Sequence, residues 1–195
     1  MESIILASAS LRRQEYFKLM GLPFSVMPAL IDESLCTHTD PLLLTRELAK
    51  RKVEKVIGEM KRIAPKWICG ADTVIAIRGK IFGKAQNRED AADTLKKLSG
   101  HQHKVVTSVA LFKGQEKKMD IRSSVCLVKF ASLSDEEIEW YLDTNEWQGV
   151  AGAYRIQGLA KCLIEKIDGC ISTVVGLPLR EFYVMLRDNG YPFGA

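Results

Sequence analysis

The chain has 195 residues, with 28 Lys and Arg against 24 Asp and Glu. We expect one substantial domain over residues 1–195, because a chain of this length buries its core without disulfides or a structural metal. The net charge of +4 is too small to predict a duplex nucleic acid as partner, and it fits a small anionic ligand better. No apolar run approaches the roughly 18 residues of a membrane span, so we expect a soluble, cytoplasmic protein with no membrane partner.

The cysteine pattern favours reduced thiols over disulfides. The five cysteines are odd in number and include no Cys-x-x-Cys pair. Cys69, Cys126 and Cys162 fall within apolar strand patterns. Thiols in such positions are typical of cytosolic proteins, so we expect these three side chains to be buried and free.

Strand and helix patterns alternate along the chain, which predicts a mixed α/β fold. Runs rich in apolar and β-branched residues predict strands over residues 4–8, 24–27, 67–77, 80–83, 104–113, 121–130, 161–167 and 173–175. Apolar periodicity with capping and stop signals predicts helices over residues 11–20, 41–63, 88–98, 134–142 and 178–190. Tight turns at residues 78–79 and 113–116 predict two hairpins and hence a mixed sheet.

Asp72 lies in the middle of a strand pattern that is apolar on both sides. A lone carboxylate in such a strand costs several kcal/mol, so it is usually protonated, paired or bound to a metal ion. One interpretation is a structural Asp bonded to backbone amides, next to Gly70. The other is a working carboxylate at the end of a core strand, where ligands of α/β sheets bind.

The segment over residues 6–13 predicts an anion site. A buried strand passes through small polar residues into a helix, where free backbone N–H groups and the helix dipole favour an anion. Ser8 and Ser10 can cap this helix or donate to the anion, and Arg13 falls on its buried stripe. The alternative is a solvated first turn with an ordinary Ser cap.

Two lysines are placed to join Asp72. Lys52 lies within the apolar stripe of the second helix, so it either extends outward to solvent or reaches a buried anion. Lys84 follows the hairpin strand that returns from Asp72, although a lysine there could also be a simple turn residue. His101 and His103 alternate beside a Gly, with no further zinc ligand nearby, and we expect both to be loop residues.

Eight ordered motifs together resemble the Maf family of nucleoside triphosphate pyrophosphatases. They lie at residues 6–13, 32–33, around 52, 70–73, 83–84, 98–107, 152–158 and 175–178. The resemblance implies an inosine-triphosphatase-like fold, with an elongated mixed β-sheet, surrounding helices and a central cleft, usually in a homodimer. It also implies that a nucleoside triphosphate and water give the monophosphate and pyrophosphate.

The resemblance also implies roles for individual residues. Asp72 matches the proton acceptor, and Glu33 with Asp72 would hold a divalent cation, Mg²⁺ or Mn²⁺. The residues that match phosphate contacts are Ser10, Arg12, Arg13, Lys52 and Lys84. The branch selective for dTTP and UTP is matched at Arg12, Thr73 and Gln157.

The chain departs from the family pattern at three places. Leu11 and Ala85 stand where proline is usual, and Gly149-Val150 stand where an Asp-Lys pair is typical. Two alternatives to a pyrimidine nucleotide pyrophosphatase therefore stay open. One is a nucleotide-sensing protein with little turnover, and the other is the same reaction on 7-methyl-GTP or another purine nucleotide.

Overall fold

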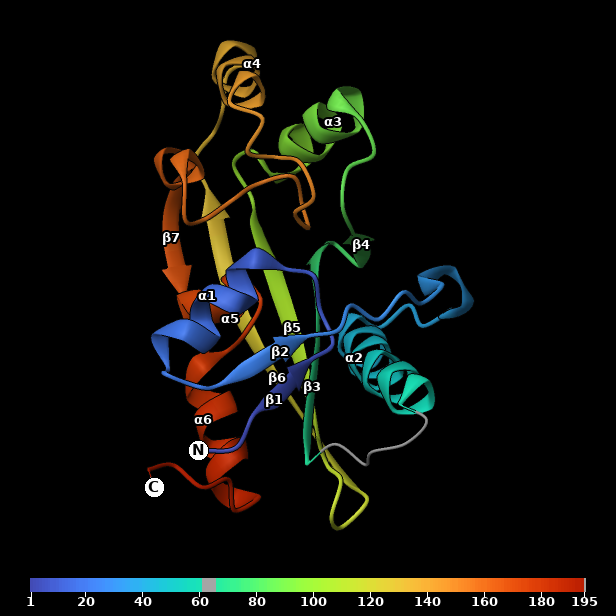
Figure 1. The fold of residues 1–195 in the computed structure, drawn as a ribbon. Coiled ribbons are helices and arrows are strands. Elements are labelled where there is room, and N and C mark those ends of the chain that lie inside the picture. Colours follow the sequence, from blue (N-terminus) through green and yellow to red (C-terminus); the bar gives the residue numbers. More distant parts are fainter. Residues whose placement is uncertain (61–65, 195) are drawn as a thin grey trace.

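The computed structural model describes residues 1–60 and 66–194, which form an elongated, seven-stranded mixed sheet with helices packed around it (Figure 1). The strand order is β2-β1-β3-β5-β6-β7, and β4 pairs with β3. The β2-β1-β3 part is parallel, and every other pair is antiparallel. The strands are β1 (Ile4–Leu6), β2 (Phe24–Val26), β3 (Trp67–Ile77), β4 (Lys80–Phe82), β5 (Gln102–Lys113), β6 (Lys118–Phe130) and β7 (Ile164–Asp168).

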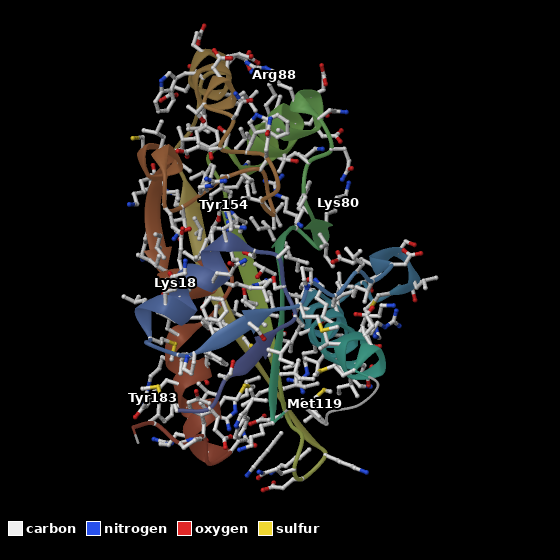
Figure 2. All side chains as sticks on the ribbon, viewed as in Figure 1. Lys18, Lys80, Arg88, Met119, Tyr154 and Tyr183 are labelled. Atoms are coloured by element: carbon white, nitrogen blue, oxygen red, sulfur yellow. The ribbon has the colours of Figure 1, made fainter. Side chains whose placement is uncertain are left out.

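The helices separate the core into three apolar clusters. One lies between the sheet and helices α1 (Leu11–Leu19) and α6 (Leu179–Asp188), and another lies between the sheet and α2 (Pro41–Glu59). The largest contains residues of α3 (Arg88–Leu98) and α4 (Asp135–Asp143) and fills the upper end of the molecule in Figure 2, where Tyr154 is labelled. The remaining helical segments are α5 (Ile171–Val175) and the short 3-10 turns η1 (Glu33–Leu35) and η2 (Leu159–Leu163).

The middle of β3 has a free edge. On that side β1 pairs with β3 only as far as Cys69, and β4 pairs with it only from Ile75 onward. Within the described residues, no strand covers the intervening stretch, which contains Asp72 and Thr73. The topology therefore leaves an opening in the sheet edge beside the buried acid.

Gly70 allows α2 to pack closely against β3. A Cβ atom at this position would lie 2.7 Å from the carbonyl oxygen of Ala49 and 2.8 Å from Cγ2 of Val53. A side chain would thus push the helix away from the strand. The close contact fixes the height of α2, and with it Lys52, above the part of β3 that contains Asp72.

The mixed α/β fold, both hairpins and the order of most elements are confirmed. Residues 173–175 were predicted as a strand but form the end of α5, which stops at Gly176 in the left-handed conformation (φ 111°). Four of the five α5 residues are buried, and this packing overrides the preference of the β-branched residues for strands. The strand predicted over 161–167 is also wrong at its start, because residues up to Leu163 form η2. Helix α2 ends at Glu59, and predicted helical residues 61–63 lie outside the described residues.

The cysteine prediction is confirmed at two of its three positions. Cys69 and Cys126 are buried, whereas Cys162 is exposed because it lies in η2 and not in a strand. All five cysteines are free thiols. Burial raises the pKa of the Cys69 thiol to about 12, so this side chain behaves as an apolar group of the core. Among the described helices, none combines the length and apolar character needed to cross a membrane.

His103 is a core residue, contrary to the prediction of a loop. The strand β5 begins at Gln102, one residue before it, and the side chain is only 1% exposed. Its Nε2 atom lies 2.8 Å from the hydroxyl of Tyr154, and its ring packs edge-on against Phe130. Burial lowers the pKa of His103 to about 4, so the native state keeps the imidazole neutral. His101 does lie in a loop, as predicted.

We expect the neutral His103 to make the fold less stable in acid. The unfolded chain binds a proton near the ordinary pKa of 6.5, while the native imidazole does so only near 4. As the pH falls from 6.5 toward 4, the unfolded state therefore binds more protons, and the free energy of unfolding decreases by roughly 2 kcal/mol at pH 5. Urea unfolding of wild type and His103→Gln at pH 7.5 and pH 5 measures this difference. Equal pH dependence in the two proteins would show that His103 does not cause it.

Candidate active site

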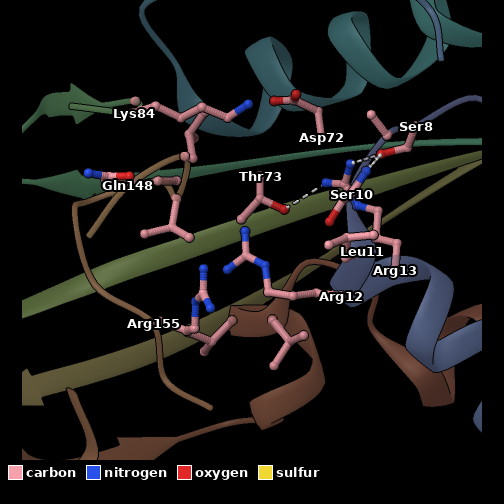
Figure 3. Close-up of a pocket in the computed structure, with 18 of the residues that line it drawn as sticks. Ser8, Ser10, Leu11, Arg12, Arg13, Asp72, Thr73, Lys84, Gln148 and Arg155 are labelled. Atoms are coloured by element: carbon pink, nitrogen blue, oxygen red, sulfur yellow. Dashed lines mark hydrogen bonds between the residues drawn. The ribbon is translucent and has the colours of Figure 1, made fainter. Parts of the chain in front are cut away.

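A cavity of about 1000 Å³ opens at the free edge of β3, between the start of α1 and the segment that follows α4 (Figure 3). Several helices, strands and loops contribute to its lining, which is rich in polar and charged side chains. Every residue that the sequence assigned to the site lines it: Ser10, Arg12, Arg13, Glu33, Lys52, Asp72, Thr73, Lys84 and Gln157.

Asp72 is paired with Lys52 in the wall of this cavity. The Nζ atom of Lys52 lies 2.6 Å from Oδ1 of Asp72 and 3.0 Å from Oε1 of Glu33. Asp72 is 6% exposed, whereas the side chain of Glu33 is 57% exposed. Lys52 thus reaches the buried acid and does not extend outward to solvent. This pairing also replaces the interpretation of Asp72 as an acid held by backbone amides, because the hydrogen bond of its carboxylate within the described chain goes to Lys52.

Arg13 is fixed by three hydrogen bonds on the other side of β3. Its Nε donates to the carbonyl oxygen of Gly176 (2.8 Å), Nη1 to the hydroxyl of Ser8 (3.0 Å) and Nη2 to that of Thr73 (3.3 Å). Burial lowers the pKa of this guanidinium, and the negative charge of Asp72 opposes the shift. An arginine still titrates far above neutral pH, so the cavity contains a rigid positive charge.

The first turn of α1 contributes backbone donors and a second arginine. Ser10 is the N-cap residue, but its side chain makes no capping bond, and its own N–H donates to Ser8 Oγ (3.3 Å). The Ser10 hydroxyl is therefore available to a ligand. Burial lowers the pKa of Arg12 to about 10, and the like charges of Arg13 and Arg155 contribute to that shift. Figure 3 shows the guanidinium groups of Arg12 and Arg155 both pointing into the cavity.

Lys84 reaches the cavity from the opposite wall. It follows β4, forms an isolated antiparallel bridge with Ala151, and is exposed. Figure 3 shows its ammonium group directed toward Asp72. The hairpin therefore carries Lys84 to the acid, as the turn at Arg78-Gly79 predicted.

Arg155 is the site residue that the sequence reasoning missed. Within the described part of the chain, its Nε atom is buried and has no hydrogen-bond partner. A buried donor without a partner costs about 1 to 3 kcal/mol, so contacts with the protein alone do not account for the position of this arginine. The signal in the sequence was a charged residue between two apolar ones, Tyr154 and Ile156, both of which are buried.

Gln157 is exposed on the loop that closes this side of the cavity, and a carboxylate positions that loop. Oε2 of Glu146 accepts a hydrogen bond from the N–H of Leu159 (2.9 Å). A Cβ atom on Gly158 would come within 2.2 Å of the same carboxylate, so a side chain at this position would displace the carboxylate of Glu146. Glu146 thus supports the loop just after Gln157.

The departures from the family pattern fall on the rim and wall of the cavity. Leu11 is 72% exposed at the start of α1, and Ala85 is half-buried just after Lys84. Gly149 and Val150 line the cavity, and Val150 is 2% exposed. These two positions contribute apolar surface where the family pattern has two charges, while Arg155 brings a positive charge to the same segment.

The carboxylates fit a hard divalent cation. Glu33 and Asp72 both contact the ammonium of Lys52, so their oxygens already share one positive charge. Magnesium is held by one or two carboxylates together with phosphate oxygens, and the site supplies the carboxylates of this donor set. The described residues contain no cluster of three His, Cys, Asp or Glu that would hold a metal by protein groups alone.

Comparison with known proteins places this site in a family. The family model described as Maf-like protein matches residues 3–189. A dTTP/UTP pyrophosphatase of Symbiobacterium thermophilum is 42% identical, with 98% of this chain and 96% of the relative covered. One of Pelotomaculum thermopropionicum is 40% identical, with 98% of each chain covered. Among solved structures, the Staphylococcus aureus Ham1 protein is similar over 67% of this chain and 72% of that chain, with 15% identity and a TM-score of 0.46. The chain, with its buried acid and ring of basic residues, belongs to the Maf-like protein family.

Proposed function

We propose that residues 1–195 act as one domain that hydrolyses dTTP and UTP to the monophosphate and pyrophosphate. The observation that carries this proposal is the pairing of buried Asp72 with Lys52, in a cavity that also holds arginines on its other side. A buried carboxylate beside several positive charges suits hydrolysis of a polyanion. The names of the full-length relatives at about 40% identity support the same reaction and the same two substrates.

In the proposed reaction, water attacks the α-phosphorus and the bond to the bridging oxygen of the β-phosphate breaks. Asp72 orients the water and accepts its proton, a role that contributes about 10²- to 10⁴-fold to the rate. Lys52 holds the carboxylate in place through the 2.6 Å contact. The negative charge that develops passes to the departing pyrophosphate, which carries it away from Asp72.

Basic groups from three walls would stabilise that charge. Arg13 is rigid because its three hydrogen bonds hold the guanidinium, so it needs no reorganisation when charge develops. Lys84, Arg12 and Arg155 approach from the other walls, and the hydroxyl of Ser10 adds a neutral donor. Arg155 lines the cavity beside Arg12, so an anion bound there would be close to both positive charges.

Glu33 and Asp72 would hold a Mg²⁺ or Mn²⁺ ion together with phosphate oxygens. Such an ion supplies charge neutralisation and helps to lower the pKa of a water molecule. In the structure these two carboxylates share the Lys52 ammonium, which would lie beside the bound cation and the phosphate oxygens. The resemblance to the family further supports a homodimer as the working assembly.

The base would lie toward Thr73, Arg12 and Gln157. The amide of Gln157 offers one acceptor and two donors, which matches the edge of uracil or thymine. The Glu146 carboxylate accepts from the N–H of Leu159 and so supports the loop from which this amide extends. A fixed hydrogen-bonding site rejects bases with a mismatched edge, since their polar groups and its own stay unpaired.

We expect pyrophosphate release from dTTP and UTP with Mg²⁺ or Mn²⁺, and its loss when EDTA removes the metal. The test is a panel of dTTP, UTP, CTP, GTP, ITP and 7-methyl-GTP at equal concentration, assayed with each metal and with EDTA. A preference for GTP or 7-methyl-GTP would show a purine enzyme with the same chemistry. Nucleotide binding with no release from any of the six would show a sensing protein and overturn the proposal.

A further inference from the structure

A chain of hydroxyl groups runs from the cavity into the sheet behind Thr73. Nη2 of Arg13 donates to Oγ1 of Thr73, which lies 2.9 Å from Oγ1 of Thr107. Oγ1 of Thr107 in turn donates to the carbonyl oxygen of Thr173 at 2.7 Å. Thr107 and Thr173 are both 0% exposed, so these protein groups decide how the inner hydroxyl is oriented.

The protons in this chain can point in only one direction. A carbonyl oxygen only accepts, and two oxygens 2.7 Å apart need a proton between them, so the single hydroxyl proton of Thr107 lies on the bond to Thr173. The 2.9 Å contact with Thr73 must then be filled by the proton of Thr73. Thr73 therefore presents only lone pairs to its other neighbours, one of which is Arg13.

We propose that Thr107 is a specificity-determining residue that acts through Thr73. By accepting the hydroxyl proton of Thr73, it makes Thr73 an acceptor only on the side of the cavity. Uracil and thymine carry a proton on N3 that such an acceptor can bind. Cytosine has a lone pair at N3, which would face the lone pair of Thr73 and be rejected.

This inference rests on the proposed function, in which Thr73 faces the base, and it explains one part of the base choice. It predicts that a residue with no contact to the nucleotide makes the protein prefer UTP over CTP. Because Thr107 is buried behind Thr73, it is a positioning residue, and its effect must appear in the comparison of two bases.

Thr107→Val removes the hydroxyl and keeps the shape. The carbonyl oxygen of Thr173 still accepts from the N–H of Gly176 (3.1 Å), so the variant leaves no buried carbonyl unpaired, and we expect it to fold. The proton of Thr73 is then free to turn toward the ligand. We expect the ratio of kcat/KM for UTP to that for CTP to fall by about tenfold. Uracil loses the hydrogen bond from its N3–H to Thr73, whereas N3 of cytosine gains one from the Thr73 hydroxyl.

Two further variants separate this effect from a general loss of structure. Thr107→Ser keeps the hydroxyl and should restore the wild-type ratio. Ser108→Ala removes a fully buried hydroxyl from the next residue of β5, one that bonds Thr45 (2.7 Å) and Ser123 (2.8 Å) and not Thr73, and should leave the ratio unchanged. Thr107→Ala serves as a second hydroxyl-free variant should Thr107→Val prove unstable.

Calorimetric binding of non-hydrolysable UTP and CTP analogues to the same proteins gives a readout that does not need turnover. A shift of the binding preference in Thr107→Val, reversed in Thr107→Ser, supports the inference. An unchanged preference, or an equal loss for both bases, overturns it and leaves Thr107 with a structural role behind Thr73 alone. Equal wild-type activity on UTP and CTP also overturns it, although UTP hydrolysis itself would stand. Binding of neither analogue would overturn both this inference and the proposed function.

Discussion

Asp72→Asn lowers kcat for UTP by about 10²-fold or more and leaves nucleotide binding within a few-fold, if Asp72 acts in the chemical step. Asparagine keeps the shape of the side chain and can still accept from Lys52, but it cannot take a proton from water. Lys52 also retains its contact with Glu33, so the variant does not leave an unpaired buried charge. Single-turnover kinetics and equilibrium binding of a non-hydrolysable UTP analogue measure the two effects separately.

Asp120→Asn is a matched control for this variant. Asp120 lies on β6, is half-buried and paired with Arg122 (2.9 Å), and does not line the cavity. We expect its kcat to match wild type. Thermal unfolding of both variants checks that each one folds. More than about a tenth of wild-type kcat in folded Asp72→Asn would remove Asp72 from the role of proton acceptor.

Arg13→Ala should reduce kcat/KM by about 2 to 4 kcal/mol, equally for dTTP and UTP, because a preorganised charge facing the transition state is lost. Arg13→Lys should recover little of this loss. A lysine has one ammonium, and it cannot contact Ser8, Thr73 and the carbonyl of Gly176 in the plane that the guanidinium uses. Steady-state kinetics with both nucleotides measures the two variants.

Arg46→Ala is the control for loss of a partly buried arginine. Arg46 lies on α2 and donates to the carbonyl oxygen of Ile121 (3.2 Å), away from the cavity lining. Its removal should change stability and leave kcat/KM unchanged. A loss in Arg13→Ala confined to one of the two nucleotides would indicate that Arg13 contacts the base and not the phosphates.

Local signals in the sequence were enough for most of the fold. The long apolar run of β3, the capping box at Ser134 and the turn at Arg78-Gly79 each specify one structure, and each is present. The end of α5 and the position of His103 depend instead on packing. Residues 173–175 have strong β preference but fill a buried turn of helix, and the alternation of β5 begins one residue before His103. Neither choice is encoded in the segment itself.

The site was predictable where a charge interrupts an apolar pattern. Lys52 and Asp72 could be paired because a charged side chain within an apolar stripe or strand is stable only when it has a partner. Arg155 has the same character but is surrounded by turn-forming glycines, which made a loop the simpler interpretation. The direction of the hydroxyl chain through Thr107 could not be predicted from the sequence, because it depends on the carbonyl of a residue 66 positions further along the chain.

The bond between Arg13 and the carbonyl of Gly176 joins residues 163 positions apart. Closing so long a loop costs conformational entropy, and it cannot happen before both residues have been synthesised. During synthesis, α1 leaves the ribosome long before its partner turn exists. The arginine can then bond Ser8 and, once β3 is made, Thr73, but a nascent chain that stops short of Gly176 lacks the third acceptor. The fixed position of the guanidinium is therefore completed only in the last stretch of translation, and we expect a chain that ends before Gly176 to lack the rigid positive charge of the full-length protein.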